Sequence, residues 1–290
     1  MSNIFWDKIR ILVTSRCNYR CSFCHNEGQP KNNSIAQLSF NQLKTLIDII
    51  FDQNVSEICF SGGEPFLNKD IVKMIQYASY NTACDISCAS NLSLITDEQI
   101  KELSKTRVKF NIQFPFITDN KFKESTGKGN LSSILDTINK VKLYGIELGL
   151  NTVIQSNDMV SVSQMVDFAL SNELPLKLLP QIGLVESGNY KENVFPILQK
   201  RAIDCVDKGT GAIRFTLQDG DHKTTVLYID SPCFTNDIIR CRQYGEVRLL
   251  PDMKLQACLL KDDALPLDIE KGKEYVINQF RQLWNNFNHC

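Results

Sequence analysis

The most informative stretch of the chain is Thr14-Ser15-Arg16-Cys17-Asn18-Tyr19-Arg20-Cys21-Ser22-Phe23-Cys24-His25, which places three cysteines in one short loop. This loop directly follows Ile9–Thr14, a β-branched run that predicts a strand. Iron–sulfur clusters take thiolate ligands, usually four. Cys17, Cys21 and Cys24 therefore predict a [4Fe–4S] cluster in which one iron is left open to another ligand. The alternative is a zinc knuckle, in which the adjacent His25 supplies the fourth ligand.

A second motif, Ser61-Gly62-Gly63-Glu64-Pro65, ends the next predicted strand, Glu57–Ser61. The two glycines permit close approach of the backbone to a ligand, and Glu64 supplies a hydrogen-bond acceptor. In α/β barrels the chemistry lies at the carboxyl ends of the strands, so the two motifs are expected to meet there.

The C-x3-C-x2-C spacing, followed one βα unit later by Gly-Gly-Glu-Pro, resembles the radical S-adenosylmethionine (SAM) superfamily. The resemblance implies that SAM chelates the open iron through its amino and carboxylate groups. It also implies that one electron from the reduced cluster cleaves SAM to a 5′-deoxyadenosyl radical. The cofactor carries this chemistry, while the protein positions it and excludes water.

The resemblance and the strand positions together suggest a wider set of SAM contacts. Phe23 stands where the family has an aromatic residue beside the adenine, and Ser90-Asn91 follows the third strand. Asn111 and Asn151 are polar residues within apolar strands; buried amides with protein partners are the alternative for them. The full set is Phe23, Gly62, Gly63, Glu64, Pro65, Ser90, Asn91, Asn111 and Asn151.

Strand-like and helix-like patterns alternate over the first two-thirds of the chain. Ser39 and Gln42, and again Thr96 and Gln99, have capping-box spacing ahead of apolar periodicity. The alternation predicts an α/β fold, a partial (β/α)6 TIM-like barrel over residues 1–182. The remainder, residues 183–290, is more irregular, with a hairpin at 246–257 and a last helix at Lys273–Phe287.

The C-terminal part holds a second cysteine group, Cys233, Cys241 and Cys258. This part resembles the Twitch-like extension of the SPASM/Twitch branch, and most of all that of the GTP 3′,8-cyclase of molybdenum cofactor biosynthesis. The resemblance implies an auxiliary [4Fe–4S] cluster, whose fourth iron binds substrate or is closed by Cys205 or Cys290. A zinc site or free core thiols are the alternatives.

Three departures from the cyclase pattern bear on the substrate. Tyr244 stands where the cyclase has a second cysteine, and Pro180 where it has an acid. Its hairpin carries arginines on alternate residues, whereas this chain has Glu246 and Arg248. The resemblance thus implies Arg248 as a substrate contact. One of the arginines with which the cyclase binds GTP is missing from this chain.

Composition bounds the class of protein. The chain has 290 residues, 43% hydrophobic and 22% charged, with a net charge of −1 and eleven cysteines. This excludes disorder and gives no basic surface for a nucleic acid. Without an apolar run long enough for a bilayer or a signal pattern, we expect a cytoplasmic protein with reduced thiols.

The expected function is that of an enzyme that abstracts hydrogen from a small-molecule or peptide substrate, in the tailoring of a natural product. Its oxidoreductase, lyase or isomerase class and its catalytic side chains are left open. Flavodoxin or ferredoxin is the expected electron donor. The alternatives are a divergent GTP 3′,8-cyclase-like enzyme and a non-catalytic iron–sulfur or zinc-binding module.

Overall fold

The structure is a computed structural model that describes residues 4–25, 35–184, 188–261 and 263–289. In this part of the chain, twelve strands form one sheet in the order β12-β11-β10-β1-β2-β3-β4-β5-β6-β9-β8-β7. The strands are β1 (Lys8–Leu12), β2 (Glu57–Ser61), β3 (Asp85–Ser90), β4 (Val108–Gln113), β5 (Leu148–Ile154), β6 (Leu176–Pro180), β7 (Ala202–Asp207), β8 (Ala212–Asp219), β9 (His222–Ile229), β10 (Glu246–Leu249), β11 (Lys254–Gln256) and β12 (Leu265–Pro266).

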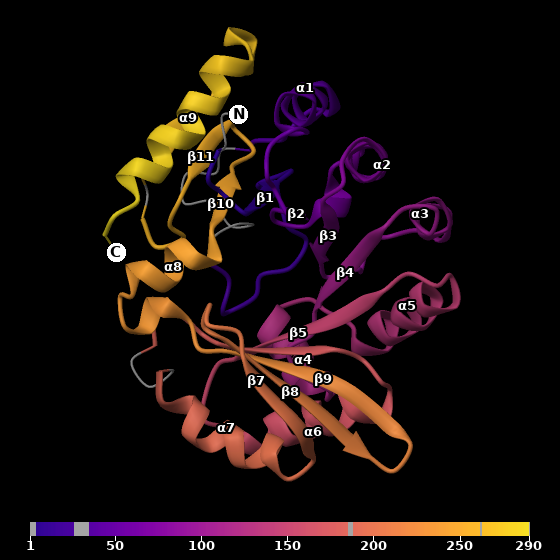
Figure 1. The fold of residues 1–290 in the computed structure, drawn as a ribbon. Helices are drawn as coiled ribbons and strands as arrows, with labels where there is room; N and C mark the ends of the chain where they lie inside the picture. The colour runs from indigo at the N-terminus through magenta and orange to yellow at the C-terminus, as the bar shows by residue number, and fades with distance from the viewer. Residues whose placement is uncertain (1–3, 26–34, 185–187, 262, 290) are drawn as a thin grey trace.

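The central strands β1 to β6 are parallel, and helices connect them on the outer face of the curved sheet (Figure 1). The α-helices are α1 (Phe40–Ile50), α2 (Ile71–Asn81), α3 (Asp97–Leu103), α4 (Asp119–Thr126), α5 (Leu131–Leu143), α6 (Met159–Ser171), α7 (Tyr190–Gln199), α8 (Ile238–Tyr244) and α9 (Lys273–Asn286). Both predicted capping boxes are present, Ser39 with Gln42 and Thr96 with Gln99. The predicted α/β fold is therefore confirmed.

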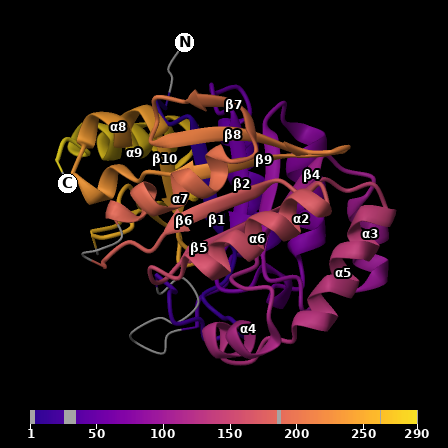
Figure 2. The ribbon, with the colours of Figure 1, turned by 90° about the horizontal axis from the view of Figure 1, so that it is seen from below.

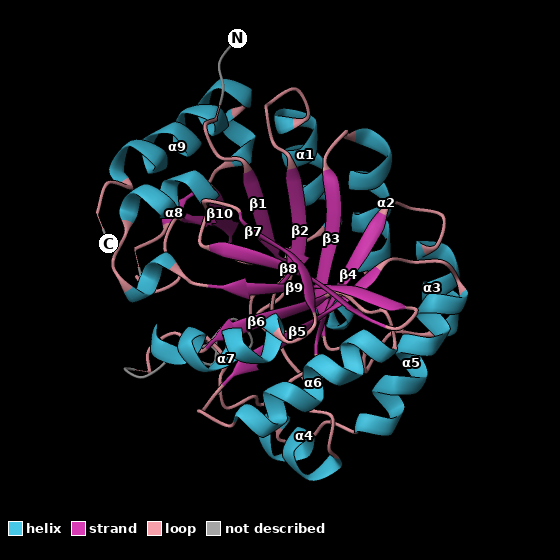
Figure 3. Ribbon diagram, turned by 60° about the horizontal axis from the view of Figure 1, so that its bottom comes forward, coloured by secondary structure: helices cyan, strands magenta, loops and turns pink. Residues whose placement is uncertain are grey.

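The C-terminal third adds strands to both edges of the parallel core. Strand β10 lies parallel to β1, with Lys8 opposite Glu246, and β9 lies parallel to β6, with Lys177 opposite Leu227. Strands β11 and β12 extend one edge and β8 and β7 the other, all antiparallel. Figures 2 and 3 show β7, β8 and β9 side by side. The strand order runs from β12 to β7 without closing, so the described sheet is an open, TIM-like partial barrel.

One part of the C-terminal third is more regular than the sequence analysis predicted. Residues 202–229 form the antiparallel meander β7-β8-β9. Gly209, Gly211 and Gly220, which punctuate this stretch, have positive φ and make its turns. The apolar residues Phe215, Val226 and Tyr228 of this meander are buried. The hairpin expected at 246–257 is present as β10 and β11, but its parallel pairing with β1 was not predicted.

The two faces of the sheet differ in character. Helix-facing positions are buried and apolar, and alternate positions point to the concave face. Polar residues at these alternate positions include Lys8, Arg10, Glu57, Ser87, Asn111, Gln113, Asn151, Lys177, Arg214, Glu246 and Arg248. We call this surface the concave face. No helix in the described part of the chain is long and apolar enough to cross a membrane.

Candidate active site

The cysteine loop lies at the carboxyl end of β1 and is fixed to the end of α4 by backbone hydrogen bonds. The Arg20 amide donates to the Thr126 carbonyl at 3.0 Å, and the Ser22 amide to the Ser125 carbonyl at 3.1 Å. The Ser22 hydroxyl also donates to Gln155 Oε1 at 2.7 Å, and Gln155 Nε2 donates to the Ser125 hydroxyl at 2.7 Å. The loop is thereby held by the end of α4 and by Gln155, which follows β5, and both lie far from it in sequence.

The Gly-Gly-Glu-Pro motif packs directly against this loop. The Gly63 amide donates to the Thr14 carbonyl at 2.8 Å, and the Glu64 amide to the Arg16 carbonyl at 2.7 Å. A Cβ at Gly63 would lie 1.9 Å from the Arg16 carbonyl oxygen, and one at Gly62, where φ is +141°, 2.6 Å from that of Thr14. Both glycines are therefore required for contact between the two motifs, a role that the sequence analysis did not foresee.

Glu64 is buried and is held by three donors. Its Oε1 accepts from the Ser90 hydroxyl at 2.7 Å and the Phe66 amide at 3.1 Å, and its Oε2 accepts from the Asn91 amide at 2.8 Å. Burial raises the pKa of Glu64 to about 7, although the three hydrogen bonds oppose that shift. The carboxylate thus joins β2 to β3 at the strand ends.

Asn91 extends this network back to the cysteine loop. Its Nδ2 donates to Asn18 Oδ1 at 3.0 Å, and Asn18 Nδ2 donates to the Ser93 hydroxyl at 2.8 Å. The Ser93 hydroxyl donates in turn to Asn91 Oδ1 at 2.6 Å. Asn18 and Ser93 were missed by the sequence analysis. The position of Asn18 directly after the first cysteine was the one signal that could have found it.

The three thiols share one half-buried site and influence one another. Burial is the main cause that raises the pKa of Cys17 to about 11 and that of Cys21 to about 12, and the neighbouring thiols contribute to both shifts. In the described residues no three His, Cys, Asp or Glu side chains converge on a point where one metal ion would sit. The thiolates of a cubane bind separate irons, so three soft ligands spread over one loop fit a [4Fe–4S] cluster.

The other sequence-predicted residues fall into two places. Phe23 is buried within the cysteine loop, and Pro65 begins the short 3₁₀ helix η1 (Pro65–Leu67) beside Glu64. Asn111 and Asn151 lie apart from these, on the concave face of β4 and β5. Asn111 Oδ1 accepts from Lys177 Nζ at 2.9 Å. The structure therefore brings residues 17–24, 62–65 and 90–91 together at the strand ends. It places Asn111 and Asn151 elsewhere, on the concave face.

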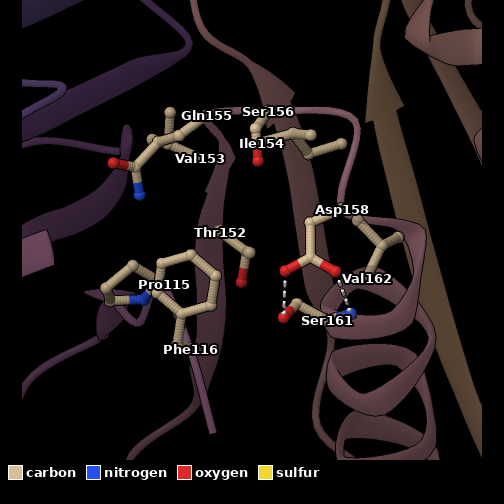
Figure 4. Close-up of a pocket in the computed structure, with 10 residues that line it drawn as sticks. All are labelled: Pro115, Phe116, Thr152, Val153, Ile154, Gln155, Ser156, Asp158, Ser161 and Val162. Atoms are coloured by element: carbon tan, nitrogen blue, oxygen red, sulfur yellow. Dashed lines mark hydrogen bonds between the residues drawn. The ribbon is translucent and has the colours of Figure 1, made fainter. Parts of the chain in front are cut away.

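A small cavity lies beside the site, between the end of β5 and the start of α6 (Figure 4). Its volume is about 20 Å³, which is room for a water molecule and not for a substrate. Asp158 lines it and caps α6, accepting from the Ser161 amide at 3.1 Å and the Ser161 hydroxyl at 2.7 Å. A hydrogen bond from Lys121 is the main cause that lowers the pKa of Asp158 to about 2. These contacts describe a helix start and not a reaction site.

The second cysteine group lies on the C-terminal elements. Cys233 is in the 3₁₀ helix η3 (Pro232–Phe234), Cys241 is in α8, and Cys258 follows β11. A hydrogen bond with the Cys241 thiol, helped by Ser231 and the charge of Arg248, lowers the pKa of Cys233 to about 6. Cys205 is exposed on β7, and Cys290 lies outside the described residues. Cys59, Cys84 and Cys88 are buried in strands or directly beside them.

A cluster of charged residues lies on the concave face, and the sequence analysis named only two of them, Glu246 and Arg248. The Arg10 guanidinium donates to both oxygens of Glu246, at 2.9 and 3.0 Å, and its Nη1 lies 3.4 Å from Cys59 Sγ. Arg248 Nη2 lies 3.9 Å from Glu246 Oε1. Burial alone would raise the pKa of Glu246, but Arg10 and Arg248 lower it to about 2. Charged residues at alternate positions of short apolar strands were the available signal.

Comparisons with known proteins agree with this geometry. The chain is 27% identical over 265 residues to the probable GTP 3′,8-cyclase of Sulfolobus acidocaldarius, covering 89% of this chain and 83% of that one. It is 28% identical over 284 residues to the GTP 3′,8-cyclase of Campylobacter jejuni, covering 91% and 84%.

Solved structures show the same fold. Streptococcus suis SuiB bound to precursor peptide SuiA superposes with a TM-score of 0.75 at 13% identity, covering 98% of this chain and 66% of SuiB. This chain thus spans slightly less than two thirds of SuiB. Native anSMEcpe with bound AdoMet superposes with a TM-score of 0.65 at 14% identity, covering 95% and 82%.

The model of the Radical SAM superfamily matches residues 11–169, more than half of the chain, and this range includes the cysteine loop, the Gly-Gly-Glu-Pro motif and Asn91. A non-catalytic iron–sulfur or zinc module is therefore set aside. The chain is an enzyme that belongs to the radical SAM superfamily.

Proposed function

We propose that Cys17, Cys21 and Cys24 hold a SAM-binding [4Fe–4S] cluster, and that the enzyme abstracts hydrogen from a small natural product or a peptide. One observation carries this proposal: the cysteine loop and the Gly-Gly-Glu-Pro motif are interlocked through the backbone at the ends of β1 and β2. These residues would hold the cluster and SAM beside each other, and positioning is the protein's main contribution to radical chemistry.

When bound, the cluster and SAM supply a 5′-deoxyadenosyl radical. The residues proposed to hold SAM are those at the strand ends, namely Phe23, Gly62, Gly63, Glu64, Pro65, Ser90 and Asn91. Because Glu64 already accepts three protein hydrogen bonds, we propose that its carboxylate orients the backbone of residues 62–65 toward the SAM amino group. Asn111 and Asn151 lie on the concave face, which would put them on the substrate side of SAM.

We also propose that residues 183–290 carry a Twitch-like auxiliary [4Fe–4S] cluster at Cys233, Cys241 and Cys258. The hydrogen bond between the first two thiols and the lowered pKa of Cys233 support it, because thiolates are the ligands of such clusters. The division into a core of residues 1–182 and an extension remains part of this proposal. So do a cytoplasmic location and an electron donor of the flavodoxin or ferredoxin type.

A GTP 3′,8-cyclase-like activity is the second candidate, and the curated relatives favour it. The concave face weighs against it. Glu246 accepts hydrogen bonds from the Arg10 guanidinium and also lies within ion-pair distance of Arg248. The two arginines are therefore not available together to bind a triphosphate. For this reason we place the tailoring reaction first.

The test is anaerobic reconstitution with iron and sulfide, followed by incubation with SAM and dithionite. We expect release of 5′-deoxyadenosine from the wild type and none from a Cys17/Cys21/Cys24→Ala variant. A parallel incubation with GTP separates the two candidates by product mass: a cyclised nucleotide would replace the tailoring proposal. Absence of 5′-deoxyadenosine from fully reconstituted wild type would overturn both.

A further inference from the structure

One row of the concave face crosses five neighbouring strands away from the cysteine loop. In register, Gln113 of β4 lies opposite Asn151 of β5, Asn151 opposite Lys177 of β6, Lys177 opposite Leu227 of β9, and Leu227 opposite Arg214 of β8. The row therefore brings two cations and two amides onto one wall, and Arg214 comes from a strand outside the parallel core. We call Asn151, Lys177 and Arg214 the lumen row.

Lys177 is a half-buried ammonium whose recorded partner is neutral. Its Nζ donates to Asn111 Oδ1 at 2.9 Å, reaching across β5 at Gly149, which pairs with Asn111 and has no side chain. Among the described residues no carboxylate lies within ion-pair distance of it. Burial is the main cause that lowers the pKa of Lys177, and the charge of Glu57 opposes this shift only in part, so a bound anion would stabilise the ammonium form.

The other two members of the lumen row have buried polar atoms with unmet hydrogen-bonding capacity. Arg214 Nε is buried without a hydrogen-bond partner among the described residues, and so is Asn151 Oδ1. The first is a charged donor and the second an acceptor. Buried polar groups are nearly always satisfied in a functional state, so the missing partners are expected from a bound molecule.

The opposite wall of the same face is already compensated. There Arg10 is bound by both oxygens of Glu246, and Lys8 Nζ lies 3.5 Å from Glu57 Oε2. Among the described residues, the cations of this face without an ion-pair contact thus lie on the β6–β9–β8 side. An anion entering the concave face would be drawn toward Lys177 and Arg214 and away from the Arg10–Glu246 pair.

We infer that Lys177 and Arg214 form a subsite for one carboxylate or phosphate group of the substrate, with Asn151 Oδ1 accepting a hydrogen bond from a neighbouring N–H or O–H of the same molecule. This inference rests on the proposed function and names its substrate class: a molecule with a single anionic group and an adjacent donor. Two cations on one wall suit a group of one or two negative charges.

The experiment uses the reconstituted enzyme and measures binding of inorganic phosphate and, separately, of acetate by calorimetry under anaerobic conditions. The variants are Lys177→Met and Arg214→Gln, with Arg214→Lys as the conservative substitution. Lys223→Gln is the matched control, because Lys223 is an exposed cation on β9 of the same sheet. Far-UV circular dichroism of each variant checks that it is folded.

We expect the wild type to bind at least one of the two anions, and the anion that binds more tightly identifies the group. Loss of one charge-assisted hydrogen bond should weaken that binding by about tenfold or more in Lys177→Met and in Arg214→Gln. Arg214→Lys should retain part of the affinity and Lys223→Gln all of it. Failure of the wild type to bind either anion, or equal binding by wild type, Arg214→Gln and Lys177→Met, would overturn the inference.

The proposed function is read out separately in the same preparations. Release of 5′-deoxyadenosine by wild type and Lys223→Gln, together with unchanged anion binding in the lumen-row variants, would remove only the anion subsite. Absence of 5′-deoxyadenosine with intact anion binding would remove only the proposed radical chemistry.

Discussion

The two cysteine groups of this chain are held in different ways. The cysteine loop at residues 17–24 is bonded through its backbone to α4, and its partner motif leaves no room for even one methyl group. The second group, Cys233, Cys241 and Cys258, lies in η3, in α8 and just after β11. Neither η3 nor α8 contains a buried residue. The fold therefore fixes the first site before any metal binds, whereas the second depends on short, half-exposed elements.

The largest expected effect separates the two groups by iron content. Reconstituted wild type should contain about eight irons, and each of the variants Cys17/Cys21/Cys24→Ala and Cys233/Cys241/Cys258→Ala about four, because we propose one cubane for each group. Iron and sulfide analysis measures this. A wild-type value near four would remove the auxiliary cluster, and loss of all iron in the second variant would show that the groups are not independent.

The next effect tests how rigidly the first site is built. Gly63→Ala should lower the free energy of unfolding of the metal-free protein by about 3 kcal/mol, because its Cβ meets backbone atoms that cannot move aside. Gly145→Ala is the matched control: φ there is +72° and nothing lies within 4 Å, so about 1–2 kcal/mol is expected. Urea unfolding measures both. An equal decrease in the free energy of unfolding in the two variants would show that the cysteine loop can shift to accommodate the added methyl group.

A third substitution acts on the bond that joins the two regions, between β1 and β10. Glu246→Gln should cost about 2 kcal/mol at neutral pH, because Arg10 loses its charged partner. The pKa of Glu246 is lowered in the folded state, so its contribution is present above the ordinary value of 4.5 and is lost as the pH falls toward 2.

Urea unfolding of wild type and Glu246→Gln across this range gives the comparison. The difference between them should be constant above about pH 5 and shrink below it. A difference that instead grew with acidification would contradict the assigned ion pair.

The smallest effect concerns the second group alone. Asp237 caps α8, its Oδ1 accepting from the Arg240 amide at 3.1 Å, and Asp237→Ala should cost about 1 kcal/mol. Because α8 carries Cys241, iron retention by the second group should fall. Thr96→Ala, which removes the cap of α3, should cost a similar amount without loss of iron. Equal iron loss in both variants would show that general destabilisation, and not the α8 start, is responsible.

The parallel core and the first site could be predicted from the sequence because their signals are local. Cysteine spacing, a strand followed by Gly-Gly-Glu-Pro, and capping boxes each report on a few consecutive residues. Gly62 and Gly63 illustrate the limit, since their tight packing against Thr14 and Arg16 depends on two loops meeting in space.

What could not be predicted depends on pairing between distant segments. The β7-β8-β9 meander was hidden by its glycines, which also suit an irregular stretch. The Arg10–Glu246 bond spans 236 positions, and the lumen row exists only because β9 joins β6. Neither segment alone indicates with which distant strand it will pair. From the sequence, Arg10, Lys177 and Arg214 can therefore be recognised only as charged residues within apolar strands.

The placement of β9 beside β6 and of β10 beside β1 has a consequence for biosynthesis. The ribosome synthesises the parallel core first, and its edge strands β1 and β6 stay unpaired on their outer side until residues 222–249 have been synthesised. Bare strand borders pair readily with other chains. The nascent protein is thus prone to aggregation until these residues have been synthesised, and recovery on refolding should decline as protein concentration rises.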